Sequence, residues 1–258
     1  MNILIGDIGN TLTKLCLVEN KNFKVKKIFY LNSNIILSKR LLKKKLDKII
    51  RNKNTVKTAL FSSVVPKYER LLKKFIYKNY KVKLKEIKKN FTNTVVKINI
   101  KNKKQVGSDR IANAVGVFKK YKSNCIVLDF GTATTFDVVT KNGVYNGGVI
   151  APGVDLSIKS LVDSADQIPT FSLIKQNNIV GKSTIEALRA GFYWGYTGLI
   201  NNIILKIESE TKKKYKVIFT GGYANLFKTS IIRPFKIDKN ITLYGIIEIL
   251  KVNKKYIN

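Results

Sequence analysis

Residues 125–140 constrain the fold more than any other part of the sequence. An apolar run at 126–128 leads into Asp129, and a second β-rich run resumes at Phe136, which is the pattern of two strands joined by a tight turn. Gly131 in the turn lets backbone approach a ligand closely, and the turn also carries Thr132, Thr134 and Thr135. Backbone N–H groups and hydroxyls bind anions, and a carboxylate suits an accompanying cation. The stretch therefore predicts a site for a nucleotide phosphate with its metal.

A second copy of this pattern lies near the N-terminus, at residues 3–14. Our alignment matches Asp7 with Asp129, Gly9 with Gly131, and Thr13 with Thr135. One copy alone could be an ordinary hairpin, because Asp, Asn and Gly are the commonest turn residues. Two copies in a chain of 258 residues indicate instead two similar half-domains that face one nucleotide.

The size and composition indicate a folded protein. A chain of 258 residues can form one large domain or two lobes, and a hydrophobic content of 45% is typical of a globular chain. No apolar run has membrane-spanning length, and we expect no signal peptide. Cys16 and Cys125 lie in apolar runs and are expected to be buried thiols, so we predict a cytoplasmic protein with no membrane partner.

Histidine is absent from the sequence. This excludes a Ser-His-Asp relay, histidine-based zinc sites and imidazole acid–base catalysis. Any general base must therefore be sought first among the carboxylates and lysines.

The formal charge is +33, and 43 of the 49 basic residues are lysines. One interpretation is a nucleic-acid site; the other, which we favour, is a biased composition on solvated faces. The commonest specific base contacts use arginine pairs, and the chain has only six arginines. We expect sequence-independent polyanion binding at low salt and no specific nucleic-acid partner.

Hydrophobic periodicity gives the remaining elements. Helices are predicted over residues 38–51, 68–80, 154–161 and 183–210, and strands over 24–31, 59–65, 82–87, 95–100 and 216–219. The long helix at 183–210 carries Gly191, Gly195 and Gly198, which cost helix stability but let another backbone approach. We expect a helix–helix or subunit contact there. Ser183 or Thr184 either caps this helix or contacts substrate.

Asp109 stands just before an apolar helical run, in the segment Gly107, Ser108, Asp109, Arg110. It is either an N-cap or a carboxylate at the rim of a substrate cleft, with Gly107 leaving room for the substrate. Arg110 offers a fork for a substrate carboxylate, or else a surface salt bridge. The glycine turn at 147–153 is expected beside the phosphate loops. The turn at 220–224 either lays flat backbone against an adenine ring or is an ordinary strand-to-helix turn.

Five motifs in this order resemble the type III pantothenate kinases, a family that includes the Bvg accessory factors. They are Asp-x-Gly-Asn-Thr, Gly-x-Asp-Arg-Ile, Asp-x-Gly-Thr-Ala-Thr-Thr, Gly-Gly-x-Ile-x-Pro-Gly and Thr-Gly-Gly-x-Ala. The resemblance spans nearly the whole chain. It implies an α/β protein of the actin-like ATPase fold, with a nucleotide between two ribonuclease-H-like lobes that we expect at residues 1–118 and 119–258. It also implies a homodimer.

The resemblance further implies that ATP phosphorylates pantothenate, the first step toward coenzyme A. Asp109 would be the general base, and Asp129 would bind an activating monovalent cation, potassium or ammonium, with magnesium also present. Pantothenate would contact Gly107, Ser108, Asp109, Arg110 and Thr184, the last possibly across the dimer. ATP phosphates would contact Thr132 and the loop Asp7, Ile8, Gly9, Asn10, Thr11, Leu12, Thr13 and Lys14.

The sequence departs from the family pattern before Gly107, where Ile100 and Lys103 replace a usual tyrosine and proline. This puts one aromatic substrate contact in doubt. Two rival functions remain open from the sequence alone. One is a kinase or polyphosphatase-like protein of the same fold with another acceptor, and the other is a non-catalytic factor that associates with nucleic acid.

Overall fold

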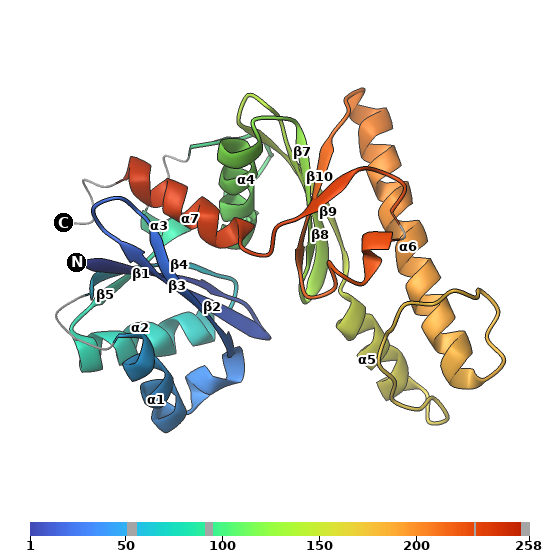
Figure 1. The fold of residues 1–258 in the computed structure, drawn as a ribbon, viewed down its shortest axis with the longest axis horizontal. Helices are drawn as coiled ribbons and strands as arrows, with labels where there is room; N and C mark the ends of the chain where they lie inside the picture. The colour runs from blue at the N-terminus through green and yellow to red at the C-terminus, as the bar shows by residue number, and fades with distance from the viewer. Residues whose placement is uncertain (51–55, 91–94, 230, 254–258) are drawn as a thin grey trace. The chain divides into compact units, whose positions relative to one another are not determined.

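The computed structural model describes residues 1–50, 56–90, 95–229 and 231–253 (Figure 1). The chain forms two compact units, one built from residues 1–120 together with the segment from 240 onward, the other from residues 121–239. The sequence predicted a boundary between residues 118 and 119, which assigns the last helix, α7 (Ile241–Val252), to the second lobe. In the structure α7 belongs to the first unit.

The first unit contains a five-stranded sheet in the order β3-β2-β1-β4-β5. Strands β1 to β3 are antiparallel neighbours, whereas β4 and β5 run parallel to β1. The strands are β1 (Asn2–Ile8), β2 (Leu12–Glu19), β3 (Val25–Asn32), β4 (Val56–Ser63) and β5 (Lys83–Glu86).

The second sheet has six strands, and the five that belong to the second unit repeat this connectivity. These five strands lie in the order β11-β10-β7-β8-β9, with three antiparallel strands followed by two strands parallel to β7. They are β7 (Cys125–Phe130), β8 (Ala133–Val139), β9 (Val144–Pro152), β10 (Lys216–Gly221) and β11 (Phe235–Ile237). The predicted internal repeat is confirmed, because each acidic turn joins the first two strands of its own sheet.

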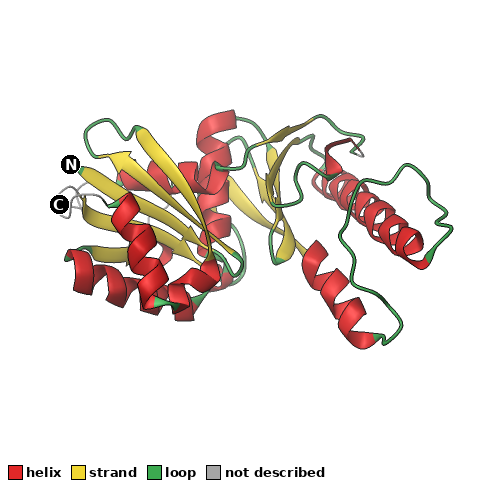
Figure 2. Cartoon of the chain, turned by 60° about the horizontal axis from the view of Figure 1, so that its bottom comes forward, coloured by secondary structure: helices red, strands yellow, loops and turns green. Residues whose placement is uncertain are grey.

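Helices α1 (Lys39–Ile49) and α2 (Pro66–Tyr80) cover one face of the first sheet (Figure 2). Helix α2 connects the parallel neighbours β4 and β5, whereas α1 connects β3 to β4, which lies beyond β2 and β1 in the sheet. Right-handed crossovers in the same direction place both helices on one face. Their apolar stripes, including Leu46 and Ile76, pack into one core with the sheet. Smaller elements of this unit are η1 (Ser33–Leu37), α3 (Ile87–Asn90), β6 (Lys97–Ile98) and η3 (Lys103–Gln105).

Helix α7 joins the first unit through close packing against α4 (Ser108–Tyr121). A Cβ on Gly245 would fall on the backbone carbonyl of Ala112, and one on Gly116 would lie 2.6 Å from the carbonyl oxygen of Ile241. Thr242 donates a hydrogen bond to Asn113 at 2.8 Å, and both side chains are buried. The glycines let the two helices approach, which explains why the end of the chain belongs with the beginning.

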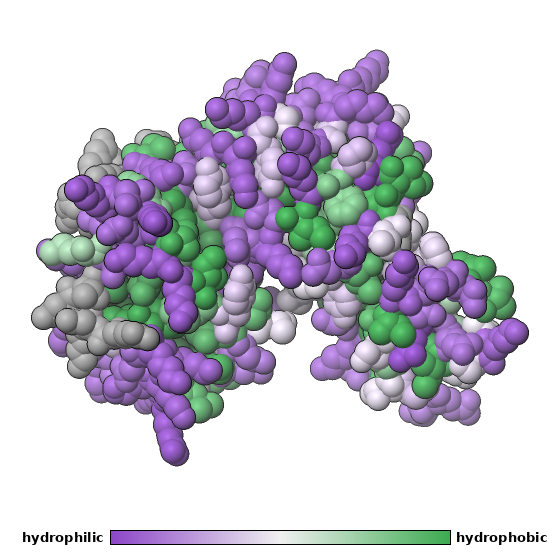
Figure 3. Space-filling view, viewed as in Figure 1, coloured by the Kyte–Doolittle hydropathy of each residue, from purple (hydrophilic) through white to green (hydrophobic). Residues whose placement is uncertain are grey.

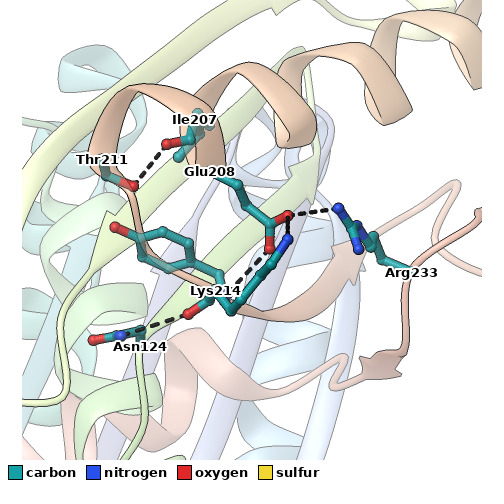
Figure 4. A network of polar contacts seen from close by, with 7 residues as sticks. Asn124, Ile207, Glu208, Thr211, Lys214 and Arg233 are labelled. Carbon is teal, nitrogen blue, oxygen red and sulfur yellow. Dashed lines mark hydrogen bonds and ion pairs between the residues drawn. The ribbon is translucent and has the colours of Figure 1, made fainter.

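Helices α5 (Val154–Ser164) and α6 (Thr184–Thr211) pack on the core face of the second sheet. The C-terminal end of α6 is fixed by Glu208, whose side chain is 7% exposed and contacts Arg233 Nη2 at 2.8 Å and Lys214 Nζ at 3.2 Å (Figure 4). Removing Arg233 or Lys214 would leave the negative charge of the buried Glu208 carboxylate less well neutralised. The short helix η4 (Phe227–Thr229) completes this unit.

Across the described part of the chain, every helix is too short or too polar to span a bilayer.

Candidate functional site

The first acidic turn is a tight loop between β1 and β2. The amide of Gly9 donates to the carbonyl oxygen of Leu12 at 3.1 Å, and a Cβ on Gly9 would lie 2.8 Å from that oxygen. Below the turn, buried Thr13 contacts the hydroxyl of Ser33 at 2.8 Å, and Ser33 donates to the Gly9 carbonyl at 2.7 Å. These bonds fix the backbone of the loop while Asn10 and its neighbours stay exposed.

The second acidic turn is one residue shorter. The amide of Gly131 donates to the carbonyl oxygen of Ala133 at 3.1 Å, so the turn contains only Gly131 and Thr132. Asp129 is half-buried at the end of β7, and Thr132 is exposed. The turn thus presents its polar groups outward from a rigid pair of strands.

The difference in length corrects one part of our alignment. Thr13 pairs with the last residue of β1, Ile8, whereas in the second hairpin the last residue of β7, Phe130, pairs with Thr134. Thr134 is therefore the counterpart of Thr13, and both are buried. The match of Thr13 with Thr135 was wrong because the sequence does not reveal a one-residue difference between turns.

Two glycine turns meet the second acidic turn: the segment 147–153, as expected, and the segment 220–224. The amide of Gly153 donates to the carbonyl oxygen of Thr132 at 3.1 Å, and a Cβ on Gly153 would fall on that oxygen. Gly221 has a φ of +86° and lies against the backbone of Phe130. Only glycine suits such a conformation and such a close approach. The ends of β7, β9 and β10 thus form a cradle of bare backbone.

A hydrogen bond between side chains joins the residues that follow the glycines of these two turns. The hydroxyl of Tyr223, just after β10, donates to the carboxylate of Asp155 in the first turn of α5. Burial and this hydrogen bond raise the pKa of Tyr223 well above its usual range, so the tyrosine remains a donor.

Asp129 has a neighbour that sequence reasoning missed. Thr220 on β10 lies opposite Asp129 in the parallel register, so both side chains are on one face of the sheet. Thr220 is fully buried, and within the described structure its hydroxyl has no hydrogen-bond partner. A carboxylate beside a hydroxyl that lacks a partner suits an oxygen-coordinated cation. The described residues contain no cluster of three or more acidic or cysteine ligands.

Asp109 lies in the first turn of α4, one residue after the helix begins. Its carboxylate accepts a hydrogen bond from the backbone amide of Arg110 at 2.8 Å. Asp109 is half-buried, and a Cβ on Gly107 would collide with its carboxylate. Gly107 therefore leaves the space that this side chain occupies. The N-cap interpretation of Asp109 is wrong, because the amide of Ile111 donates to Gly107, which precedes the first helical residue.

Three serines place Asp109 beside the first acidic turn. Ser108 donates to the carbonyl of Ser63 at 3.0 Å and accepts from the amide of the same residue at 2.9 Å. Ser62, which donates to Ser108 at 3.2 Å, lies opposite Asp7 in the parallel register. The start of α4 is thus bonded to the end of β4, next to the end of β1.

The first unit therefore gathers the loop from Asp7 to Lys14 and the segment from Gly107 to Arg110 at one edge of its sheet. Sequence reasoning missed Ser62, Ser63 and the structural role of Ser108. The signal that could have found them is the pair of hydroxyl residues that ends an apolar strand.

Thr184 lies elsewhere, at the first position of α6, where it is exposed. The N-cap is Ser183, whose hydroxyl accepts from the amide of Glu186 at 3.3 Å, so Thr184 is not needed for capping. Thr184 instead lines a groove of about 620 Å³ on the second unit, together with residues of α5 and α6.

Both cysteines are fully buried, as predicted. Burial raises the pKa of Cys16 to about 12 and also raises that of Cys125. Neither thiol has the low pKa of a reactive cysteine, so their positions beside the acidic turns reflect packing.

Comparison with known proteins agrees with this reading of the fold. The sequence model of the type III pantothenate kinase family matches residues 3–206. A type III pantothenate kinase of Pelagibacter ubique (strain HTCC1062) is 50% identical over 245 residues, which cover 95% of this chain and 97% of that protein.

Solved structures give the same fold at lower sequence identity. A conserved Baf family protein of Campylobacter jejuni matches with a TM-score of 0.62 at 21% identity, covering 98% of this chain and 99% of the other. The ethanolamine utilization protein EutJ of Carboxydothermus hydrogenoformans matches with a TM-score of 0.52 at 13% identity, over 96% and 90% of the two chains.

Two α/β units of one topology, each with an acidic glycine turn after its first strand, define an actin-like ATPase fold. Within that class, the family model and the 50% identity to the Pelagibacter protein identify one family. The chain belongs to the type III pantothenate kinase family.

Proposed function

We propose that this protein phosphorylates pantothenate with ATP, giving 4'-phosphopantothenate, the first step of coenzyme A biosynthesis. Family membership supports this activity. The observation in the chain itself that supports it best is the placement of Asp109 at the same sheet edge as the glycine turn after β1. A phosphate-binding turn and a general base that lie together can act on the same two reacting groups, the terminal phosphate of ATP and the hydroxyl of pantothenate.

The loop from Asp7 to Lys14 contacts the ATP phosphates in this proposal. Its backbone is held by the Thr13, Ser33 and Gly9 hydrogen bonds, so its amides need no rearrangement when phosphate binds. Thr132, exposed in the second turn, supplies a further phosphate contact.

Asp109 acts as general base. Its carboxylate accepts the proton of the pantothenate hydroxyl as the oxygen attacks the terminal phosphorus of ATP. The bond from the terminal phosphorus to its bridging oxygen breaks, and ADP leaves. The hydrogen bond from the Arg110 amide orients the carboxylate, and the guanidinium of Arg110 binds the carboxylate of pantothenate.

Asp129 holds the activating monovalent cation, potassium or ammonium, with Thr220 as a neighbouring oxygen donor. Magnesium accompanies the ATP phosphates, where it offsets negative charge. We place the enzyme in the cytoplasm, where pantothenate and ATP are available and buried thiols such as Cys16 remain reduced.

The protein forms a homodimer through α5 and α6 in this proposal. The groove of about 620 Å³ is lined by Pro152, Phe192, Leu199 and other mainly apolar side chains. Apart from the adjoining backbone of α6, nothing in the described chain lies within 4 Å of a Cβ built on Gly191 or Gly195, so a partner helix can approach there. Thr184 lines the same groove, which would bring it close to the partner subunit.

The test of this function is ATP consumption by the purified protein, with and without pantothenate, in potassium and then in sodium buffer. We expect consumption that depends on pantothenate and is several-fold faster in potassium. Dependence on pantothenate with equal rates in both buffers would remove the cation assignment alone. ATP consumption without any pantothenate dependence would remove the substrate assignment.

A further inference from the structure

The positive charge of the chain is distributed very unevenly. The first unit holds 34 of the 49 basic residues and 7 of the 16 acidic ones. A bias that acts on composition alone would enrich both units in lysine to a similar extent. The proposed kinase reaction also requires no cations far from the residues that bind ATP and pantothenate.

Much of this excess lies on the outer surface of α1 and α2. The two helices carry eleven exposed lysines and arginines, which we call the basic face: Lys39, Arg40, Lys43, Lys44, Lys45, Lys48, Lys67, Arg70, Lys73, Lys74 and Lys78. In Figure 3, hydrophilic side chains gather over the area where Figure 1 places these helices.

The acidic residues of these helices offset little of this charge. Asp47 binds Lys43 at 2.6 Å and accepts a hydrogen bond from the hydroxyl of Tyr80 at 2.7 Å. Glu69 is buried. Within the described residues, the ten other cations of the basic face take part in no ion pair.

The two helices form one continuous surface. The hydrogen bond from Tyr80 to Asp47 joins α2 to α1, and their apolar residues share one core. Cations that extend across two adjacent helices give a broad positive field, which suits a chain of phosphates better than a single small anion.

The arrangement favours nucleic acid over an anionic membrane. A helix that lies on a membrane inserts its apolar face, but Leu42, Leu46 and Ile76 are buried in the protein core. Nine of the eleven cations are lysines, which contact phosphates as point charges and rarely read bases. We propose that the basic face binds the phosphate backbone of nucleic acid, independently of sequence.

The test compares two quadruple variants of the full-length protein with the wild type. Lys44, Lys45, Lys73 and Lys74 are changed to glutamine in the face variant, and Lys206, Lys213, Lys228 and Lys236 in the control. All eight are exposed, and both variants lose the same charge. Binding of a labelled single-stranded RNA of mixed sequence is followed by fluorescence anisotropy between about 50 and 200 mM salt.

We expect the face variant to bind at least tenfold more weakly than the control at the lowest salt. The slope of log affinity against log salt should fall by about 3 for four lost phosphate contacts. Unchanged circular dichroism and pantothenate-dependent ATP consumption in both variants would show that the fold and kinase site are intact.

Three results would overturn the proposal. Equal loss of binding in both variants would show that the charge acts diffusely. A strong preference for one RNA sequence over a scrambled one would contradict sequence-independent binding. Tighter binding to vesicles of anionic lipid than to RNA, lost in the face variant, would identify a membrane surface instead. None of these results depends on whether the protein phosphorylates pantothenate.

Discussion

Asp109 is the residue whose chemistry the proposed reaction depends on most. Its place is fixed from both sides, because Ser108 is bonded to β4 and the amide of Arg110 donates to the carboxylate. A carboxylate that is already oriented loses little freedom when the substrate hydroxyl binds. An isosteric change should therefore remove the base and leave the surrounding bonds largely in place.

We predict that Asp109→Asn lowers kcat by about 10² to 10⁴-fold, the usual contribution of a general base. The matched control is Asp163→Asn, an exposed acid near the end of α5, which should retain wild-type activity. Steady-state kinetics with pantothenate as the varied substrate would measure both. Activity of Asp109→Asn within a factor of about three of the wild type would exclude Asp109 as the base.

Sequence reasoning succeeded for residues whose role depends on local chemistry. Gly9 and Gly153 were recognised as turn residues because glycine is needed where backbone approaches backbone closely. It failed where the role depends on a distant partner. Thr13 was matched with Thr135 because pattern alone cannot show a turn that is one residue shorter, and Thr220 was missed because its neighbour Asp129 is 91 positions away.

At the scale of elements, helix positions were predicted to within a few residues. The 28 residues of α6 were expected over 183–210, and its Ser183 cap was one of two alternatives. The placement of α7 was not predictable, because it depends on contact with α4 about 130 positions earlier. The clue was present in Gly116 and Gly245, but a helical glycine alone does not identify its partner.

The packing of α4 on α7 gives a prediction about stability. Gly245→Ala should lower the free energy of unfolding by about 1–3 kcal/mol, because the new methyl group meets backbone atoms of Ala112 that cannot move independently. Gly198→Ala in α6 is the control, since among the described residues nothing outside the adjoining backbone of α6 lies within 4 Å of a Cβ built there. That change should stabilise the protein by up to about 1 kcal/mol through helix propensity.

Urea denaturation followed by circular dichroism would measure both glycine variants. Equal changes in the two would contradict the close packing of α4 on α7.

For the whole molecule, the sequence contained the main feature, a repeated acidic turn, and the structure shows that the repeat extends through five strands of each unit. The repeat was detectable because each copy needs the same residues at the same positions after its first strand. From the sequence, the excess of lysine was interpreted as biased composition, because pattern alone does not show that the cations of α1 and α2 share one surface.

The proposed dimer makes a prediction at this scale. Gly195→Leu would place a large side chain in the groove where a partner helix is expected, so the dimer should dissociate at least tenfold more readily. Gly198→Leu, on the same helix, is outside the residues that line the groove and should have a smaller effect. Sedimentation equilibrium would compare them, and a wild-type protein that is monomeric at micromolar concentration would contradict the dimer.

The most direct measurement of the central claim is the identity of the phosphorylated product. The protein is incubated with ATP, magnesium, potassium and an equal mixture of pantothenate and several sugars and polyols, and the products are separated and identified by mass spectrometry. We predict a single phosphorylated product, 4'-phosphopantothenate, whose formation is lost with Asp109→Asn. A phosphorylated sugar in its place, with pantothenate left unmodified, would contradict the account.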